Sequence, residues 1–353
     1  MTTLDTITTP ALLVDGPTLI ENIRRIAARA RARGVELWPH VKTHKSTEIA
    51  QLQREHGARG LTAATLREAE CFASAGFERL LLAYPPAGEW RLERIRRLAE
   101  TVDLRVVVDS VEAVATLDDA QSYLWEVDCG VGRTGTTPGE ATADLIAAAG
   151  GRFAGLLTFG GHAYAAADSN GIAAAAQDEV DAHATTMDAL AAHGIEASAR
   201  SAGSTPTVTA LDEVGPITEI RPGNYVFNDA TQVVLGVADE QQCALSVLAT
   251  VVSKPKENRA ILDCGSKALA AERLTPRSTT FGFVASHPEL SVDRLYEEHA
   301  IVTAAEPTAL AVGDRVRVVP NHACATTNLH ERMHILEDGE VADVWNVDAR
   351  GWG

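Results

Sequence analysis

One lysine of this sequence stands where a lysine can do chemistry. Lys42 belongs to the segment Pro39–Lys45, which follows an apolar run typical of a strand. An amine held among apolar neighbours at the end of a barrel strand can act as a nucleophile or as a base. A lone lysine at the mouth of a loop is more often a solvated surface charge, and this segment alone leaves both interpretations open.

Three glycines surround Arg133 in the segment Asp128–Gly135. Glycine lets the backbone approach a ligand closely, and a planar guanidinium is well suited to binding an anion in a pocket. An ordinary glycine-rich turn explains the same residues equally well. Arg133 therefore becomes a candidate binding residue only in combination with other segments.

Two later segments have the composition of phosphate-binding loops. Ser201–Thr207 places small hydroxylated residues before Pro206, and proline is favoured in the first turn of a helix. N–H groups at a helix N-terminus bind phosphate, and barrels often use the loops after strands seven and eight for this purpose. Arg221–Tyr225 occupies the next such loop. A pair of ordinary turns is the alternative, and the adjacent positions of the two loops favour phosphate binding.

A histidine and a cysteine lie two positions apart in Asn321–Cys324. If the chain is extended there, His322 and Cys324 project to the same face, and this pair of ligands suits zinc. Only two protein ligands are evident, so water or substrate must complete the coordination, as in catalytic zinc sites. A buried cysteine beside a structural histidine is the alternative for this short segment alone.

The order of elements indicates how these residues are positioned. From about residue 17 to 235, short apolar runs alternate with longer amphipathic runs, which predicts parallel strands joined by helices. Eight repeats favour a (β/α)8 barrel, whose active site lies at the carboxyl ends of the strands. The predicted strands are Val35–Val41, Gly60–Ala63, Arg79–Ala83, Leu104–Val108, Ser122–Val127, Phe153–Leu157, Glu196–Ala199 and Ile217–Ile220. The predicted helices include Thr18–Arg33, Arg67–Ala75, Glu89–Glu100 and Asp178–His193.

The pattern changes after about residue 240, where short β-type runs are separated by Gly, Pro and Asn. These runs predict a smaller, mostly antiparallel β domain, with Pro10–Asp15 as an additional strand. They are Val247–Val252, Arg259–Leu262, Thr279–Val284, Ala300–Thr303 and Arg315–Val319. We therefore predict a barrel domain over residues 15–238 and a β domain formed by residues 1–14 and 239–353.

Composition excludes several classes of partner. The net charge of −17 disfavours binding to nucleic acid or to an anionic membrane. The N-terminus has no signal-peptide pattern, and the long uncharged stretch Phe153–Ala167 is too short to span a bilayer. The five cysteines are scattered, without a Cys-x-x-Cys pair, which suits a reducing compartment. We expect a cytoplasmic protein that acts on a small molecule.

Taken together, the four segments resemble those of the fold-type III pyridoxal-phosphate enzymes. The branch they resemble contains D-serine dehydratases, D-threo-3-hydroxyaspartate dehydratases and D-threonine aldolases, with alanine racemase a more distant relative. The resemblance extends from Thr9–Asp15 to Pro320–Cys324, and the order and spacing of the motifs are more specific than any one of them. It implies an alanine racemase-like (β/α)8 barrel that binds pyridoxal 5'-phosphate (PLP), followed by an antiparallel β domain.

The resemblance also implies individual roles. Lys42 matches the lysine that holds PLP as a Schiff base, and Arg133 matches an arginine beside the phenolic oxygen of the cofactor. Arg221 sits where alanine racemases place an arginine against the pyridine nitrogen. The other residues implied to line the cofactor are His162, Tyr164, Ser204, Thr205, Gly223, Asn224 and Tyr225.

The second implied ligand is a divalent metal. His322 and Cys324 match the metal pair of the dehydratases, whereas D-threonine aldolases of this branch typically carry a His-x-Asp pair. Zinc is the favoured ion, with manganese or magnesium as alternatives.

The implied activity is that of a PLP- and metal-dependent lyase. The favoured reaction converts a D-3-hydroxy amino acid such as D-serine to a 2-oxo acid and ammonia, in a homodimer. The alternative is retro-aldol cleavage to glycine and an aldehyde. A racemase needs a second base, typically a tyrosine of the β domain, and the surroundings of Tyr296 do not match the racemase motif. A non-catalytic PLP carrier usually lacks the C-terminal β domain.

Overall fold

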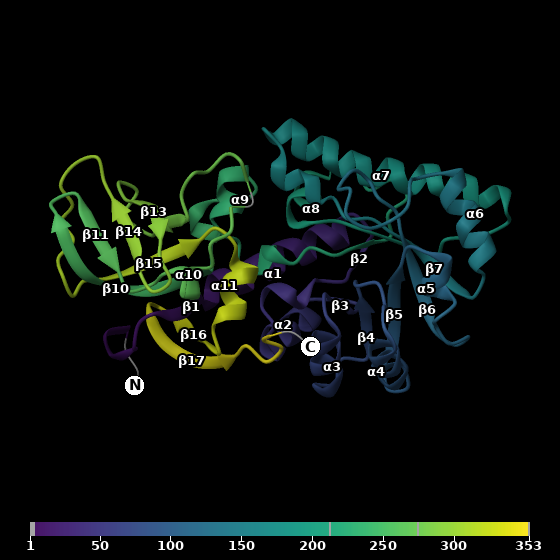
Figure 1. The fold of residues 1–353 in the computed structure, drawn as a ribbon, viewed down its shortest axis with the longest axis horizontal. Coiled ribbons are helices and arrows are strands. Elements are labelled where there is room, and N and C mark those ends of the chain that lie inside the picture. Colours follow the sequence, from purple (N-terminus) through teal and green to yellow (C-terminus); the bar gives the residue numbers. More distant parts are fainter. Residues whose placement is uncertain (1–3, 212, 274, 352–353) are drawn as a thin grey trace. The chain divides into compact units, whose positions relative to one another are not determined.

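The computed structural model describes residues 4–211, 213–273 and 275–351 (Figure 1). The chain forms two compact units. The barrel unit comprises residues 25–42, 49–223 and 351, and the β unit comprises residues 4–24, 43–48 and 224–350. The barrel domain predicted over residues 15–238 therefore differs from the compact barrel unit at residues 15–24, 43–48 and 224–238.

Eight parallel strands form the sheet of the barrel unit, in the order β2-β9-β8-β7-β6-β5-β4-β3. Bridges from Leu37 to Ala58 and from His40 to Thr62 join the two ends of this sheet, so it closes into the predicted (β/α)8 barrel. Its strands are β2 (Glu36–Leu37), β3 (Leu61–Ala63), β4 (Arg79–Leu82), β5 (Asp103–Val108), β6 (Ser122–Glu126), β7 (Arg152–Leu157), β8 (Ala199–Ala202) and β9 (Glu219–Ile220).

One predicted strand is displaced along the chain. The structure places β8 at Ala199–Ala202, whereas the sequence predicted Glu196–Ala199. Ser201 pairs with Leu157 of β7 and with Glu219 of β9, so the barrel supplies hydrogen-bond partners to a segment that has no β-branched residues. Ser201 and Ala202 therefore end a strand instead of beginning a loop.

Helices follow most strands, and side-chain caps start several of them. Thr65, Ser110, Asp168 and Ser204 each accept a hydrogen bond from a backbone N–H in the first turn of a helix. The helices up to residue 210 are α1 (Gly16–Ala32), α2 (Thr47–Glu55), α3 (Leu66–Ser74), α4 (Glu89–Ala99), α5 (Val111–Val114), α6 (Glu140–Ala149), α7 (Ser169–Ala192) and α8 (Thr205–Ala210), with single 3-10 turns η1 (Leu4–Thr6), η2 (Val41–Thr43) and η3 (Gly161–Ala165).

The strands of the barrel bury both faces. On β6, Leu124 packs with Leu81 and Val107 of neighbouring strands inside the barrel. Tyr123 and Trp125, which point to the opposite face, belong to a second cluster that includes residues of α6 and α7. Because both faces are buried, apolar residues predominate in strands such as β4 and β6 and do not alternate with exposed polar ones.

An ion pair crosses the interior of the barrel. Arg105 of β5 and Glu219 of β9 are not on adjacent strands. The two terminal nitrogens of Arg105, Nη1 and Nη2, nevertheless each donate to one carboxylate oxygen of Glu219, at 3.0 and 3.1 Å. The side chains are only 11% and 4% exposed, and the Arg105 guanidinium lies 3.8 Å from the centroid of the Trp38 ring. This pair occupies space that apolar side chains fill elsewhere in the barrel.

We predict that Arg105→Met destabilises the protein by about 3–5 kcal/mol, because Glu219 is left buried and unpaired. Urea denaturation followed by circular dichroism measures this change. The bidentate pair of Arg94 and Glu70 is the matched control, since those side chains are 25% and 36% exposed and Arg94→Met should cost at most about 1 kcal/mol. Equal effects of the two substitutions would contradict the prediction.

The β unit contains a nine-stranded sheet in the order β11-β14-β13-β12-β15-β10-β1-β16-β17. Its neighbouring strands are antiparallel apart from β1 and β16, and pairing of β10 with β11 closes part of the sheet into a barrel. The strands are β1 (Ala11–Asp15), β10 (Leu245–Lys256), β11 (Arg259–Leu262), β12 (Gly282–Val284), β13 (Ser291–Leu295), β14 (Ala300–Thr303), β15 (Arg315–Pro320), β16 (Arg332–Glu337) and β17 (Glu340–Asn346). Its helices are α9 (Ala230–Leu235), α10 (Ser266–Leu269) and α11 (Ala323–Leu329), with 3-10 turns η4 (Asn224–Val226) and η5 (Glu240–Gln242).

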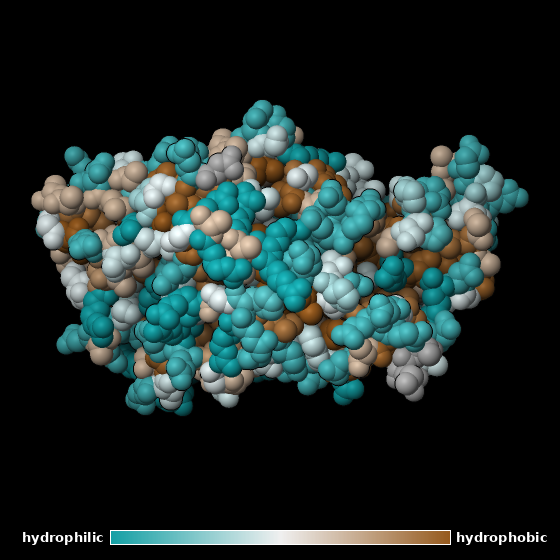
Figure 2. Space-filling model, turned by 180° about the vertical axis from the view of Figure 1, so that it is seen from behind, coloured by the Kyte–Doolittle hydropathy of each residue, from teal (hydrophilic) through white to brown (hydrophobic). Residues whose placement is uncertain are grey.

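The surface is largely polar. Charged and polar side chains cover much of the face shown in Figure 2, with apolar patches between them. Among the helices of the described residues, none combines the length and the apolar character needed to cross a membrane.

Candidate active site

In the barrel unit, Lys42 and Arg133 converge on one aromatic ring. Lys42 lies in η2 after β2, and its Nζ is 5.7 Å from the centroid of the Phe159 ring. The guanidinium of Arg133 is 5.0 Å from the same centroid. Phe159 follows the carboxyl end of β7. The three side chains therefore come from segments that follow different strands of the barrel, and for Lys42 and Arg133 the sequence predicted such positions after strands. The sequence did not single out Phe159.

The loop that carries Arg133 is organised by a carboxylate at its start. Asp128 accepts hydrogen bonds from the backbone N–H groups of Gly130, Val131 and Gly132 at 2.9–3.1 Å. Although burial opposes ionisation, these N–H groups hold the pKa of Asp128 below its ordinary value. Gly130 and Gly132 have φ of +127° and +68°, which explains the glycines of this segment.

Glu126 of β6 is the anion nearest to Arg133. Its Oε1 accepts a hydrogen bond from Thr134 at 2.9 Å and lies 4.0 Å from the Arg133 guanidinium. Burial raises the pKa of Glu126, and the charges of Arg133 and Arg221 oppose that rise. Together, Glu126 and Arg133 line a small cavity with Phe159.

Arg221 is buried at the end of β9. Its guanidinium donates to Ser201 Oγ at 3.0 Å and to the carbonyl oxygen of Thr158 at 2.6 Å. Burial lowers the pKa of Arg221, and the charges of Glu179 and Glu219 partly offset this. Arg221 is therefore fixed by the ends of β7 and β8, which are the strands before two of the predicted binding loops.

One carboxylate of α7 joins these two loops. Glu179 is 2% exposed, and its Oε1 accepts from the N–H groups of Gly160 and Gly203 at 2.9 and 2.8 Å and from the Thr158 hydroxyl at 3.2 Å. Gly203 has φ of +104°, and a Cβ there would lie 2.5 Å from Val208. The sequence did not identify Glu179, because its role depends on contacts between distant segments.

His162 and Tyr164 lie in η3, after β7. The Nε2 of His162 is 3.0 Å from a carboxylate oxygen of Asp178, and the His162 ring lies 3.4 Å from where a Cβ of Gly130 would be. His162 is thereby placed against the loop of Arg133. Tyr164 is half-buried in the same turn.

Ser204 and Thr205 begin α8. The Ser204 side chain accepts from the N–H of Thr207, and the Thr207 side chain accepts from the N–H of Ser204, which is a capping box. Pro206 lies in the first turn, as its position in the sequence indicated. The hydroxyl of Ser204 is therefore used in forming the helix, and its predicted contact with phosphate remains a prediction.

The last predicted cofactor residues lie where the two units meet along the sequence. Gly223 is buried at the end of the barrel unit, and Asn224 and Tyr225 are buried in η4 of the β unit. The Asn224 amide donates to the carboxylate of Asp229, while no partner for its Oδ1 is present among the described residues.

The predicted metal pair is close together, although the chain is not extended. His322 is the residue before α11, and Cys324 lies in the first turn of that helix. Asp229 and Thr231 hold the start of this helix: Asp229 accepts from the N–H of Ala323, its first residue, and Thr231 donates to the Asn321 carbonyl.

Anionic groups surround His322 within the β unit. Its Nδ1–H donates to the carboxylate of Glu272, and the Cys324 sulfur is 3.1 Å from the Thr43 hydroxyl. Burial opposes protonation, but the charges of Cys324, Glu272 and Asp229 raise the pKa of His322 to about 10. These surroundings favour positive charge on the imidazole ring. In the described part of the chain, no cluster of three or more histidine, cysteine or acidic side chains has the geometry of a metal site.

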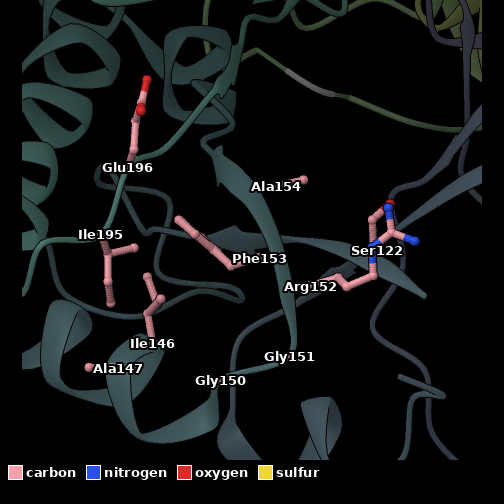
Figure 3. Close-up of a pocket in the computed structure, with 10 residues that line it drawn as sticks. All are labelled: Ser122, Ile146, Ala147, Gly150, Gly151, Arg152, Phe153, Ala154, Ile195 and Glu196. Carbon is pink, nitrogen blue, oxygen red and sulfur yellow. The ribbon is translucent and has the colours of Figure 1, made fainter. Parts of the chain in front are cut away.

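A cavity of about 450 Å³ lies elsewhere in the barrel unit (Figure 3). Ser122 and Arg152, the first residues of β6 and β7, line it together with Ile146 of α6 and Glu196. Because the strands are parallel, this cavity lies at their amino ends, away from the ends that carry Arg133 and Arg221. None of the predicted site residues lines it.

Comparison with protein families gives two matches along the chain. A model described as the N-terminal domain of alanine racemase matches residues 14–231. A model of a serine dehydratase domain matches residues 244–336. The first match covers more than half of the chain, and its range contains Lys42, Arg133 and Arg221.

Three curated proteins are similar over nearly their whole length. D-threo-3-hydroxyaspartate dehydratase of Delftia sp. is 35% identical over 99% of this chain and 99% of its own. D-threonine aldolase of Arthrobacter sp. is 32% identical over 98% of this chain and 93% of its own. D-serine dehydratase of Dictyostelium discoideum is 28% identical over 95% of each.

The solved structure of the Delftia enzyme superposes with a TM-score of 0.92, at 34% identity and over 100% of both chains. Two further structures of that enzyme carry alanine in place of a histidine and of a cysteine, and these lie two positions apart in its sequence. The cysteine variant is described as the metal-free form. His322 and Cys324 have the same spacing in this chain.

Proposed function

The chain belongs to the family of PLP-dependent lyases that includes D-threo-3-hydroxyaspartate dehydratase, D-threonine aldolase and D-serine dehydratase, and we propose that it eliminates the β-hydroxyl of a D-3-hydroxy amino acid. The products are a 2-oxo acid and ammonia, and for D-serine the oxo acid is pyruvate. The observation that supports elimination over cleavage is Cys324, which stands where the aldolases of this family typically carry aspartate.

The residues of the barrel unit fit PLP. Lys42 supplies a primary amine that can bond to an aldehyde, and Arg133 and Arg221 supply positive charge in a chain whose net charge is −17. Glycines at positions 160 and 203 leave no room for a Cβ, which would lie 2.7 Å from Glu179 or 2.5 Å from Val208, so both loops pack closely against α7 and α8. We propose that Lys42 holds the cofactor and that Ser204, Thr205, Gly223 and Asn224 hold its phosphate.

PLP, when bound, supplies an electron sink for charge that develops at the α-carbon of an amino acid. When its Nζ is not bonded to the cofactor, Lys42 would be placed to take the α-proton of the substrate as a general base. Phe159 packs against Lys42 and Arg133 and excludes water from the side of the amine that it covers. Arg221 has no hydrogen-bond acceptor, so it would disfavour protonation of a pyridine nitrogen held beside it.

The His322 and Cys324 side chains fit zinc, since imidazole and thiolate are ligands of this borderline-soft ion. Glu272 orients the imidazole through Nδ1, which leaves Nε2 for a metal. A zinc ion held there supplies a Lewis acid that helps the β-hydroxyl to leave. Open coordination positions are required for this role, and two protein ligands leave them available.

Product analysis tests the proposed reaction. Purified protein with PLP and zinc is expected to form equal amounts of pyruvate and ammonia from D-serine, and oxaloacetate from D-threo-3-hydroxyaspartate. D-threonine distinguishes the two reactions, because elimination gives 2-oxobutyrate and cleavage gives glycine and acetaldehyde. Turnover should stop after chelation and return with zinc.

Glycine and an aldehyde as the main products would support the second candidate, a D-threonine aldolase activity, which is that of the similar Arthrobacter enzyme. L-Serine is the stereochemical control, and equal turnover of both enantiomers would contradict the proposal.

We also propose that the protein is a cytoplasmic homodimer. The resemblance to the family supports the dimer, and the absence of disulfides among its five cysteines supports a reducing compartment. Sedimentation equilibrium of the purified chain tests the oligomeric state.

A further inference from the structure

A single buried carboxylate connects a predicted cofactor residue to the predicted metal pair. Asp229 is 0% exposed and lies immediately before α9. Its Oδ2 accepts from the Asn224 amide and, at 2.9 Å, from the N–H of Ala323, the residue between the two predicted metal ligands. Its Oδ1 accepts from the N–H of Gln232 at 3.1 Å and caps the helix.

Helix capping alone does not explain this carboxylate. A cap needs one oxygen and one or two N–H groups in the first turn of the helix. Asp229 uses Oδ1 for that bond. Its Oδ2 instead binds Asn224, five residues earlier in the chain, and Ala323, 94 residues later. A buried carboxylate with this number of donors is held rigidly, because each donor would be left unsatisfied if the carboxylate moved.

Both partners of Oδ2 belong to ligand sites under the proposed function. Asn224 is a predicted phosphate contact, and Ala323 fixes the first turn of α11, where Cys324 is located. Because the rigid carboxylate binds both segments, a ligand that sets the position of one segment also sets the position of the other, so the second ligand meets a segment already in place.

We propose that Asp229 is a positioning residue that couples PLP binding to metal binding, so that each ligand tightens the binding of the other. This inference rests on the proposed function, because it requires that the chain binds both ligands. The coupling factor is expected to be about tenfold, within the usual range for linked sites. By reciprocity, zinc changes the PLP affinity by the same factor by which PLP changes the zinc affinity.

Equilibrium titrations test the coupling without measuring activity. The apoprotein is titrated with PLP, followed by absorbance, once with chelator and once with saturating zinc. Zinc affinity is measured by competition with a chromogenic chelator, with and without PLP. For the unaltered protein, both ratios are expected to be about ten.

Asp229→Asn keeps an oxygen that can cap α9, but it cannot accept from both Asn224 and Ala323. For Asp229→Asn, the coupling factor is expected to fall to about one. Both ligands should still bind, each with lower affinity than in the unaltered protein. Asn224→Ala keeps the bonds of Asp229 to Gln232 and Ala323 and removes only the bond to the Asn224 amide. It should also lose the coupling, and it replaces Asp229→Asn in the test if that variant does not fold.

Two controls separate coupling from a general loss of structure. Asp168→Asn alters a carboxylate that caps α7 by accepting from the Gly171 N–H and has no bridge to a second segment among the described residues, so it should keep the coupling factor. Thr231→Val removes the bond to the Asn321 carbonyl, so it should weaken zinc binding and keep the coupling.

Two results would overturn the inference in distinguishable ways. If the unaltered protein binds PLP and zinc independently, or if Asp229→Asn retains the coupling, the inference fails and the proposed function stands. If the protein binds no PLP, the proposed function fails and the inference fails with it.

Discussion

Lys42→Ala is expected to lower turnover of D-serine by about 1000-fold or more and to remove the visible absorbance of the lysine-bound cofactor. The proposed function gives Lys42 two tasks, covalent attachment of PLP and removal of the α-proton. Loss of a general base alone typically costs between about 100- and 10,000-fold. The side chain is half-buried against Phe159, so its truncation should leave the barrel folded.

Borohydride reduction followed by peptide mapping measures the attachment directly. The protein has five lysines, so the modified peptide identifies the residue without ambiguity. Lys45→Met is the matched control, because Lys45 lies three residues away and its amine is hydrogen-bonded to the Ala349 carbonyl at 3.5 Å. We expect this variant to keep the absorbance and the modification at Lys42. A cofactor attached to another lysine, or full turnover by Lys42→Ala, would overturn the proposed role.

The barrel could be predicted because its signal is local. Each strand and helix of a (β/α)8 barrel is a short segment with its own periodicity, and repetition of the unit identifies the fold. The strand β8 was misplaced because Ala199–Ala202 has weak β propensity and is defined by its neighbours. The strands β13, β16 and β17 were not predicted. In β13 and β17 the exposed positions carry charged residues such as Arg294 and Glu340, whereas β16 buries Met333, Ile335 and Leu336 between charged end residues.

The site was predicted where its residues occur in sequence motifs. Arg221 directly follows β9, and Lys42 and Arg133 lie in the segments after β2 and β6, where the topology of a parallel barrel brings side chains together. Glu179 and Asp229 have no such signal, because a charged residue in or before a helix usually faces solvent. Their roles come from hydrogen bonds to segments that the fold alone brings near. The metal role of His322 and Cys324 stays a prediction, and the structure places the pair at the start of a helix instead of in an extended segment.

Cys324→Ala is expected to abolish stoichiometric zinc binding and to lower D-serine turnover by about 1000-fold, which corresponds to ~4 kcal/mol of transition-state stabilisation. Hydroxide is a poor leaving group, and the only assistance proposed for it is a metal held by His322 and Cys324. Metal content by atomic emission and kcat on the same samples give both quantities. The PLP absorbance should persist, because Lys42 is intact.

Cys243→Ala is the matched control, since Cys243 is a half-buried thiol of the same unit and its sulfur makes only a weak contact with the Asp239 carbonyl at 3.9 Å. It should keep both zinc and turnover. Cys324→Asp makes the test sharper, because a carboxylate restores a negative ligand and shifts preference from zinc towards the harder ions manganese and magnesium. We expect this variant to regain a divalent ion and to release more glycine from D-threonine than the unaltered protein does. If Cys324→Ala retained zinc and full turnover, the metal would have to be held elsewhere, and the preference for elimination drawn from Cys324 would lose its basis.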